Sequence, residues 1–141
     1  MKYWDSSALL PLLVRETHSD RMAEIVVEDP AIATWWASSV ECVSAIARLE
    51  REGAIESASV RDALDRLKEA AQSWAEVPAT PPVREQAIRL LRMHRLRAGD
   101  ALQLAAAIVA ADFEPGTLEF VTLDARQAAA AEREGLRVIS A

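Results

Sequence analysis

The stretch KYWDSSALLPLLVR, residues 2–15, contains the change of structure on which the fold prediction rests. Its first part, Lys2–Asp5, is typical of a short buried strand that ends in a carboxylate. The part that follows, Ser6–Arg15, is apolar on all sides, which is typical of a buried helix. A strand that passes at an aspartate into a buried helix predicts an α/β fold.

The alternation of strand and helix continues along the rest of the chain. Further strands are expected at Ala31–Thr34, Ala75–Val77, Leu118–Leu123 and Arg137–Ile139. Further helices are expected at Ser19–Glu28, from a cap at Ser38 or Ser39 to Glu52, and at Ser57–Trp74, Pro81–His94, Ala98–Ala111 and Asp124–Glu134. This order predicts a central parallel sheet of four to five short strands, with about seven helices on its two faces.

Length and composition favour one domain over residues 1–141, because 141 residues that are 51% hydrophobic can bury a single core. No apolar run is long enough for a bilayer span, and Met1–Asp5 does not resemble a signal peptide. With Cys42 as the single cysteine, a cytoplasmic location without a membrane partner is expected.

The net charge of -6 argues against nucleic-acid binding by overall charge. It is compatible with carboxylates that are concentrated in one site and neutralised there by metal. It is equally compatible with an acidic surface that meets a basic partner.

Three aspartates stand where a strand ends or a buried helix begins. Asp5 closes the first predicted strand, Asp124 follows the strand Leu118–Leu123, and Asp100 lies at the start of the apolar helix Ala98–Ala111. The carboxyl ends of parallel strands share one edge of the sheet, so these acids are expected to face one crevice. Taken separately, each aspartate also fits a helix N-cap.

Glu41 lies inside a predicted helix, where it cannot act as a cap. Its alternative role is a surface ion pair with Arg48. Four carboxylates gathered at one crevice would repel one another strongly, which is hard to explain without a cation. Ligands that are all oxygen favour Mg²⁺ or Mn²⁺, and such ions activate water and stabilise charge on a phosphodiester.

At these residues the sequence resembles PIN-domain nucleases. The segment YWDSSAL (3–9) is similar to their opening motif, LRAGDALQLAAA (96–107) to their central motif and FVTLD (120–124) to their late strand motif. Glu41 falls in the expected helix. The resemblance covers essentially the whole chain and, at this length, is to VapC-type toxins of bacterial toxin–antitoxin pairs. It implies a single PIN-like domain.

The resemblance also implies an activity and a set of site residues. It implies a Mg²⁺-dependent endoribonuclease, with Mn²⁺ as a substitute, that cleaves RNA by metal-activated water. Such toxins are commonly homodimers and are held inactive by a partner antitoxin. The residues carried over are Asp5 and Asp100 as principal metal ligands, Glu41 and Asp124 as ligands that act directly or through water, and Ser7 and Thr122 as hydroxyl support.

A basic cluster precedes Asp100 and consists of Arg92, His94, Arg95 and Arg97. Arg97 is the best candidate for holding an RNA phosphate, because it is close to Asp100. Arg92 and Arg95 are explained at least as well as cations that complement a helix C-terminus. His94 is expected at the surface.

Two other classes of protein compete with the nuclease. A receiver-like phosphotransfer domain requires an acid pair near the first strand and a late lysine, but Asp5 has no adjacent acid and the lysines are Lys2 and Lys68. A catalytically silent PIN-like domain that only binds a protein partner stays open as the alternative. The presence of all four acids argues against it.

Overall fold

The fold is built on one sheet of five short parallel strands. The computed structural model describes all residues from Met1 to Ala141. Its strands are β1 (Lys2–Trp4), β2 (Ile32–Trp35), β3 (Ala75–Val77), β4 (Glu119–Val121) and β5 (Arg137–Ile139). Their order is β3-β2-β1-β4-β5, and every neighbouring pair is parallel. The predicted α/β class with a central parallel sheet is confirmed.

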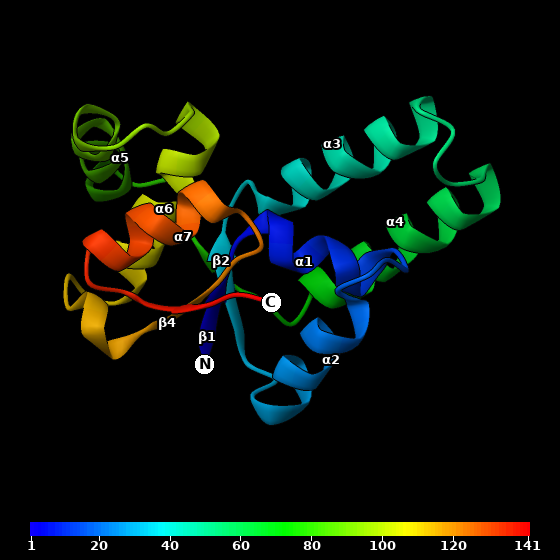
Figure 1. Ribbon diagram of the computed structural model, residues 1–141, viewed down its shortest axis with the longest axis horizontal. Coiled ribbons are helices and arrows are strands. Elements are labelled where there is room, and N and C mark those ends of the chain that lie inside the picture. Colours follow the sequence, from blue (N-terminus) through cyan, green and yellow to red (C-terminus); the bar gives the residue numbers. More distant parts are fainter.

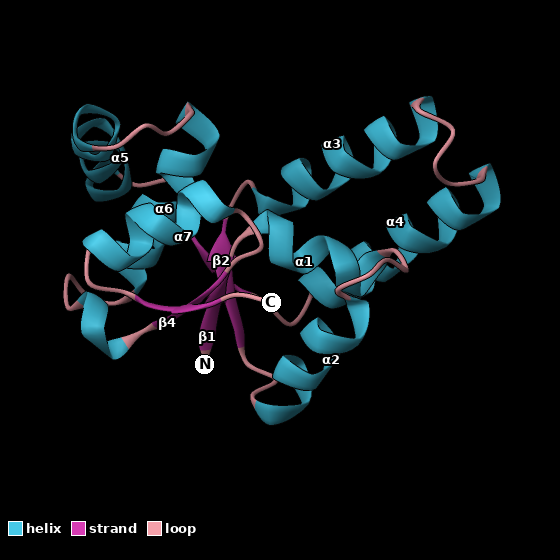
Figure 2. Cartoon of the chain, in the orientation of Figure 1, coloured by secondary structure: helices cyan, strands magenta, loops and turns pink.

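Seven helices cover the two faces of this sheet (Figures 1 and 2). One layer consists of α1 (Ser6–Leu13), α2 (Ser19–Glu28), α3 (Ser38–Arg51) and α4 (Ser57–Ala71). The other consists of α5 (Pro81–Met93), α6 (Ala98–Ala110) and α7 (Ala125–Arg133). The predicted number and order of helices are confirmed, and their bounds differ from the predicted ones by a few residues. None of these helices has the length and apolar character needed to cross a membrane.

The side chains of the central strand alternate between two hydrophobic cores. Tyr3 packs into the core beneath α5, α6 and α7, where its ring stacks on Phe120 with the centroids 5.4 Å apart. Trp4 packs into the opposite core, beneath α1 to α4. Neither side chain is exposed. Burial on both faces explains why two large aromatic residues, Tyr3 and Trp4, follow one another in this strand.

The direction in which the chain builds the sheet reverses at β1. The chain passes from β1 to β2 on one side, whereas β4 and β5 lie on the other side. In open parallel sheets, such a reversal leaves a crevice beyond the carboxyl ends of the strands. Asp5 follows β1 directly and Asp124 follows β4 after two residues, so both lie at this point. Helices α1, α3 and α7 begin near the same end of the sheet (Figure 1).

Two local predictions are wrong. Helix α3 has Ala37 at its N-cap, not Ser38 or Ser39. Ser38 is fully buried, and its hydroxyl oxygen accepts a hydrogen bond of 2.9 Å from Nε2 of Gln103. His94 is not at the surface, because only 7% of its side chain is exposed and its Nε2 lies 2.7 Å from Oε1 of Glu134. Ser38 and His94 are each bound by a residue far away in the sequence, Gln103 and Glu134, which a local pattern cannot predict.

The stacked pair at the centre of the sheet predicts a large stability effect. We expect Phe120→Ala to lower the free energy of unfolding by about 3–5 kcal/mol, because it leaves a cavity beside Tyr3. Urea unfolding followed by circular dichroism measures this change. The matched control is Phe113→Ala, since Phe113 is 52% exposed, and its expected effect is below about 1 kcal/mol. Equal losses in the two variants would contradict this account of the core.

Candidate active site

The four predicted acids come from four different helix starts around the crevice. Asp5 is the N-cap of α1 and Asp124 is the N-cap of α7. Glu41 and Asp100 lie in the first turns of α3 and α6. Four helix N-termini therefore point their positive dipole ends toward this region, which favours negative charge there.

Asp5 is the most deeply buried of the four, with 1% of its surface exposed. Its Oδ1 accepts hydrogen bonds from the Ser7 hydroxyl at 2.6 Å and from the Ala8 backbone N–H at 3.2 Å. Its Oδ2 accepts one from the Thr122 hydroxyl at 2.9 Å. Burial raises the pKa of Asp5 to about 6; these hydrogen bonds oppose the rise, and repulsion from Asp124 adds to it. The two hydroxyls that the sequence suggested as support, Ser7 and Thr122, thus both contact Asp5.

Glu41 is half-buried and faces the interior of the site. Its Oε2 accepts a hydrogen bond of 2.7 Å from the Ser6 hydroxyl, and its Oε1 accepts one of 3.3 Å from Nε2 of Gln103. Burial raises the pKa of Glu41, the two hydrogen bonds lower it, and repulsion from Asp100 raises it again. The polar partners of Glu41 are therefore Ser6 and Gln103, so the alternative ion pair with Arg48 is wrong.

Asp100 and Asp124 are joined through Gln127 on α7. The Oδ1 of Asp124 accepts hydrogen bonds from the backbone N–H groups of Arg126 at 2.8 Å and Gln127 at 3.2 Å, which confirms its capping role. The Nε2 of Gln127 lies 3.5 Å from Oδ1 of Asp100. Asp100 itself is not the N-cap of α6; its Oδ2 accepts a bond of 3.3 Å from the backbone N–H of Arg97, which is the N-cap.

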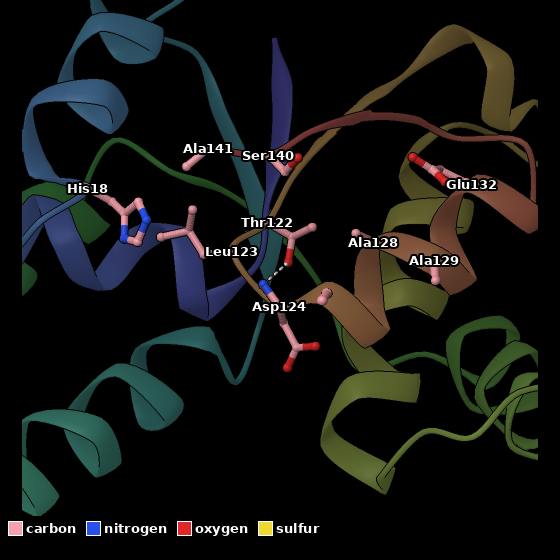
Figure 3. Close-up of a pocket in the computed structure, with 10 residues that line it drawn as sticks. His18, Thr122, Leu123, Asp124, Ala128, Ala129, Glu132, Ser140 and Ala141 are labelled. Atoms are coloured by element: carbon pink, nitrogen blue, oxygen red, sulfur yellow. Dashed lines mark hydrogen bonds between the residues drawn. The ribbon is translucent and has the colours of Figure 1, made fainter.

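A shared hydroxyl links two of the acids directly. Thr122 donates to the Asp5 carboxylate, and its oxygen accepts the backbone N–H of Asp124 at 3.1 Å. Figure 3 shows this second bond, together with the Asp124 carboxylate pointing away from Ser140 and Ala141. Because Gln127 continues the link from Asp124 to Asp100, these acids belong to one hydrogen-bonded group.

No cationic side chain neutralises this group. The chain has 16 lysines and arginines, yet none of its ion pairs involves Asp5, Glu41, Asp100 or Asp124. Instead the acids repel in two pairs, Asp5 with Asp124 and Glu41 with Asp100. An uncompensated, partly buried set of oxygen ligands suits a hard divalent cation.

The arrangement is open and is not a closed ligand cage. No group of three His, Cys, Asp or Glu side chains lies close enough together to hold one ion. The Oε1 of Gln127, whose Nε2 contacts Asp100, is buried and has no hydrogen-bond partner. The carboxylates have the chemistry that suits a divalent cation, but as they stand they would supply only part of its shell, and water would have to complete it.

Three residues of this region were not predicted as site residues: Ser6, Gln103 and Gln127. Gln103 carried a signal, because it is the one polar residue between Asp100 and Asp112. It is fully buried and accepts a hydrogen bond of 2.7 Å from the Tyr3 hydroxyl. Gln127 follows Asp124 by three residues, as in a capping box. Ser6 carried no signal beyond its place next to Asp5.

Two side chains near the acids that could act as nucleophiles, Cys42 and Tyr3, stay protonated at neutral pH. Burial, with repulsion from Glu41 and Asp5, raises the pKa of the Cys42 thiol to about 12. Burial and the same two carboxylates raise the pKa of Tyr3 well above its ordinary value. Neither side chain therefore supplies an anionic nucleophile at neutral pH.

A cavity of about 380 Å³ lies beside the site, between α7 and the C-terminal residues (Figure 3). Thr122 and Asp124 line it, whereas Asp5, Glu41 and Asp100 do not. The cavity therefore borders the acidic group and does not contain it. The side chain of Arg97, the candidate for holding phosphate, belongs to an exposed residue at the start of α6.

Comparisons with solved structures show the fold. One match is a toxin–antitoxin complex from Klebsiella pneumoniae, with 16% identity, a TM-score of 0.62 and coverage of 92% of this chain and 91% of that chain. Another is PAE2754 from Pyrobaculum aerophilum, with 20% identity, a TM-score of 0.66 and coverage of 99% and 89%. A third is FitAcB from Neisseria gonorrhoeae, with 14% identity, a TM-score of 0.67 and coverage of 99% and 96%.

These likenesses extend over nearly the whole of each chain, and they confirm the predicted PIN-like fold class. No protein-family model matches the sequence, and no curated protein matches it either.

The burial of Asp5 predicts a pH-dependent stability in the absence of divalent cations. The folded-state pKa of about 6 lies above the ordinary 3.8, so between these values the folded protein keeps a proton that the unfolded chain has lost. The Asp5 contribution to the free energy of unfolding therefore falls as pH rises from about 4 to about 6. We expect Asp5→Asn to be more stable than the wild type at pH 7, by on the order of 1–3 kcal/mol.

Thermal and urea unfolding in chelator, at pH 4 and pH 7, measure this difference. The gain should shrink at pH 4, where Asp5 is largely protonated in the folded protein. Asp62→Asn is the control, because Asp62 is exposed on α4. An Asp5→Asn variant that is less stable than the wild type at pH 7 would contradict the account of this site.

Proposed function

We propose that the protein is a Mg²⁺-dependent endoribonuclease and acts as the toxin of a type II toxin–antitoxin pair. One observation carries this proposal: four carboxylates from four helix starts lie at the switch point of a parallel sheet without any cationic side chain to neutralise them. Such a set of oxygen ligands suits a metal-dependent phosphodiester hydrolase.

In this proposal Asp5 and Asp100 are the principal ligands of the cation. Glu41 and Asp124 complete its shell, directly or through water. When bound, a divalent cation supplies positive charge that acidifies a water molecule and stabilises charge that develops on the phosphodiester. Because the carboxylates form no closed cage, water would complete the shell of the cation.

The other residues of the site orient the carboxylates. Ser7 and Thr122 hold both oxygens of Asp5, so its carboxylate has a fixed direction. Ser6 and Gln103 do the same for Glu41. Positioning of this kind reduces the reorganisation needed when substrate binds.

The biological role rests on the fold and on the sequence resemblance together. The likeness to a structure described as a toxin–antitoxin complex, over 91% of that chain, supports a toxin that binds an antitoxin. The motifs around Asp5, Asp100 and Asp124 support RNA as the substrate. We further propose that the toxin is a cytoplasmic homodimer and that the antitoxin keeps it inactive.

Removal of a principal ligand is expected to abolish cleavage. Asp5→Asn and Asp100→Asn should each lower the rate of RNA cleavage in Mg²⁺ by at least about 100-fold, since even supporting residues of metal sites contribute 10- to 100-fold. The assay follows cleavage of single-stranded RNA by gel electrophoresis. Asp62→Asn should cleave at the wild-type rate. Full activity in a folded Asp5→Asn or Asp100→Asn variant would refute these roles.

A metal titration separates the nuclease from a catalytically silent PIN-like domain. We expect Mn²⁺ or Mg²⁺ to raise the melting temperature of the wild type, because a ligand that binds only the folded state stabilises it. The increase should be absent in Asp5→Asn. Calorimetric titration gives the affinity directly. No detectable binding in a folded, partner-free sample would favour the silent domain.

A further inference from the structure

A second charged feature of the molecule lies beside the acidic site. A cavity of about 220 Å³ opens between α7 and the loop that joins α5 to α6. Its charged or titratable lining consists of His94, Arg95, Arg126 and Arg133, and the remaining lining residues are apolar. We call these four residues and the hollow between them the basic cavity. No carboxylate lines it.

Helix periodicity places two of the arginines on one face of α7. Arg126 and Arg133 are seven residues apart, which is close to two full turns. At 1.5 Å per residue, their Cα atoms lie about 10 Å apart along the axis. Ala129 and Ala130 lie between them, and their small side chains leave the hollow open. Arg95 comes from the opposite wall.

The guanidinium groups of the basic cavity are not neutralised within the chain. Arg95, Arg126 and Arg133 take part in none of the ion pairs. The nearby Glu134 is occupied, because it binds His94 and forms a two-point contact with Arg89 at 2.6 and 3.2 Å. Three like charges around one hollow repel, so an anion there would be stabilised.

Phosphate is the anion that best suits this cavity. The planar fork of an arginine matches phosphate oxygens and can bind two of them at once. In a chain with a net charge of -6, this concentration of unpaired cations is a local exception. The carboxylates of the acidic site repel the phosphates of RNA. Arginine side chains close to the site would offset this repulsion and hold the RNA.

Each wall of the basic cavity begins within a few residues of a group that binds one of the acids. The backbone N–H of Arg126 binds Asp124, and Arg95 stands two residues before Arg97, whose backbone N–H binds Asp100. We propose that the basic cavity binds RNA backbone phosphates that flank the phosphodiester held at the four acids. This inference rests on the proposed function, whose acidic site it extends into a substrate path.

The test compares two charge-matched double variants. The cavity variant is Arg126→Gln with Arg133→Gln. The control is Arg51→Gln with Arg61→Gln, at exposed positions of α3 and α4 that form no ion pair. Fluorescence anisotropy with a labelled single-stranded RNA, in EDTA to prevent cleavage, gives the affinity at several salt concentrations. Circular dichroism verifies that each variant is folded.

The cavity variant should bind RNA about tenfold more weakly than the wild type. The slope of log affinity against log salt should become shallower by about 0.7 for each phosphate that the cavity variant no longer binds. The control should change affinity less than about twofold, because it alters only the distant net charge. A third variant, Arg126→Lys with Arg133→Lys, keeps the charge and should recover part of the affinity.

Three results would overturn the subsite. The first is an equal loss of affinity in the cavity and control variants, since the RNA would then respond only to net charge. The second is unchanged affinity of the cavity variant for both RNA and a polyglutamate peptide. The third is unchanged RNA affinity with a loss of binding to a polyglutamate peptide, which would make the cavity a docking surface for an acidic protein segment.

Cleavage assayed separately in Mg²⁺ distinguishes this inference from the proposed function. If the wild type cleaves RNA while the cavity variant binds it like the control, the subsite fails and the nuclease stands. If the wild type does not cleave RNA but the cavity variant loses affinity, the nuclease fails and the phosphate subsite stands.

Discussion

The carboxylate of Asp5, held in the interior at the end of the central strand, is the constraint on which the arrangement of the site depends. Burying a charge at this position without a partner is costly. Two hydroxyl groups and a backbone N–H donate hydrogen bonds to the carboxylate, and no cationic side chain pairs with it. Those donors come from the start of α1 and from the residue after β4. The same bonds that hold Asp5 therefore fix the junction of β1 with β4, where the sheet changes direction.

The sequence predicted features that depend on local pattern. Strand and helix order followed from the apolar runs. Helices α3 and α7 are each followed by a glycine with positive φ, Gly53 and Gly135, a conformation that glycine adopts readily. The four acids could be predicted because strand ends share an edge of a parallel sheet. Their partners were harder to predict. Gln103 bonds to Tyr3 and Ser38 across 100 and 65 residues, and no local rule encodes such distances.

Opposite charges are separated on this molecule over a short distance. Unneutralised acids gather where α1, α3, α6 and α7 begin, and unpaired arginines line the basic cavity between α7 and the loop that joins α5 to α6. Asp124 and Arg126 are only two residues apart, but Asp124 lies in the acidic site and Arg126 lines the basic cavity. Residues two positions apart on a helix point in different directions. The net charge of -6 for the whole chain does not predict the charge of either region. The local charge around each site decides whether it attracts a cation or an anion.

Helix α3 contributes to the site at one end only. Its first turn carries Ser38 and Glu41 in the polar network of the site, whereas its far end meets α4 beyond the edge of the sheet (Figure 2). The reversal at residues 52–56 lies at the opposite end of α3 from Glu41, and its Ile55 packs against the core beneath α1 to α4. Because Ile46 is buried in the core beneath α1 to α4, the position of Glu41 depends on apolar packing more than one helical turn beyond the polar network of the site.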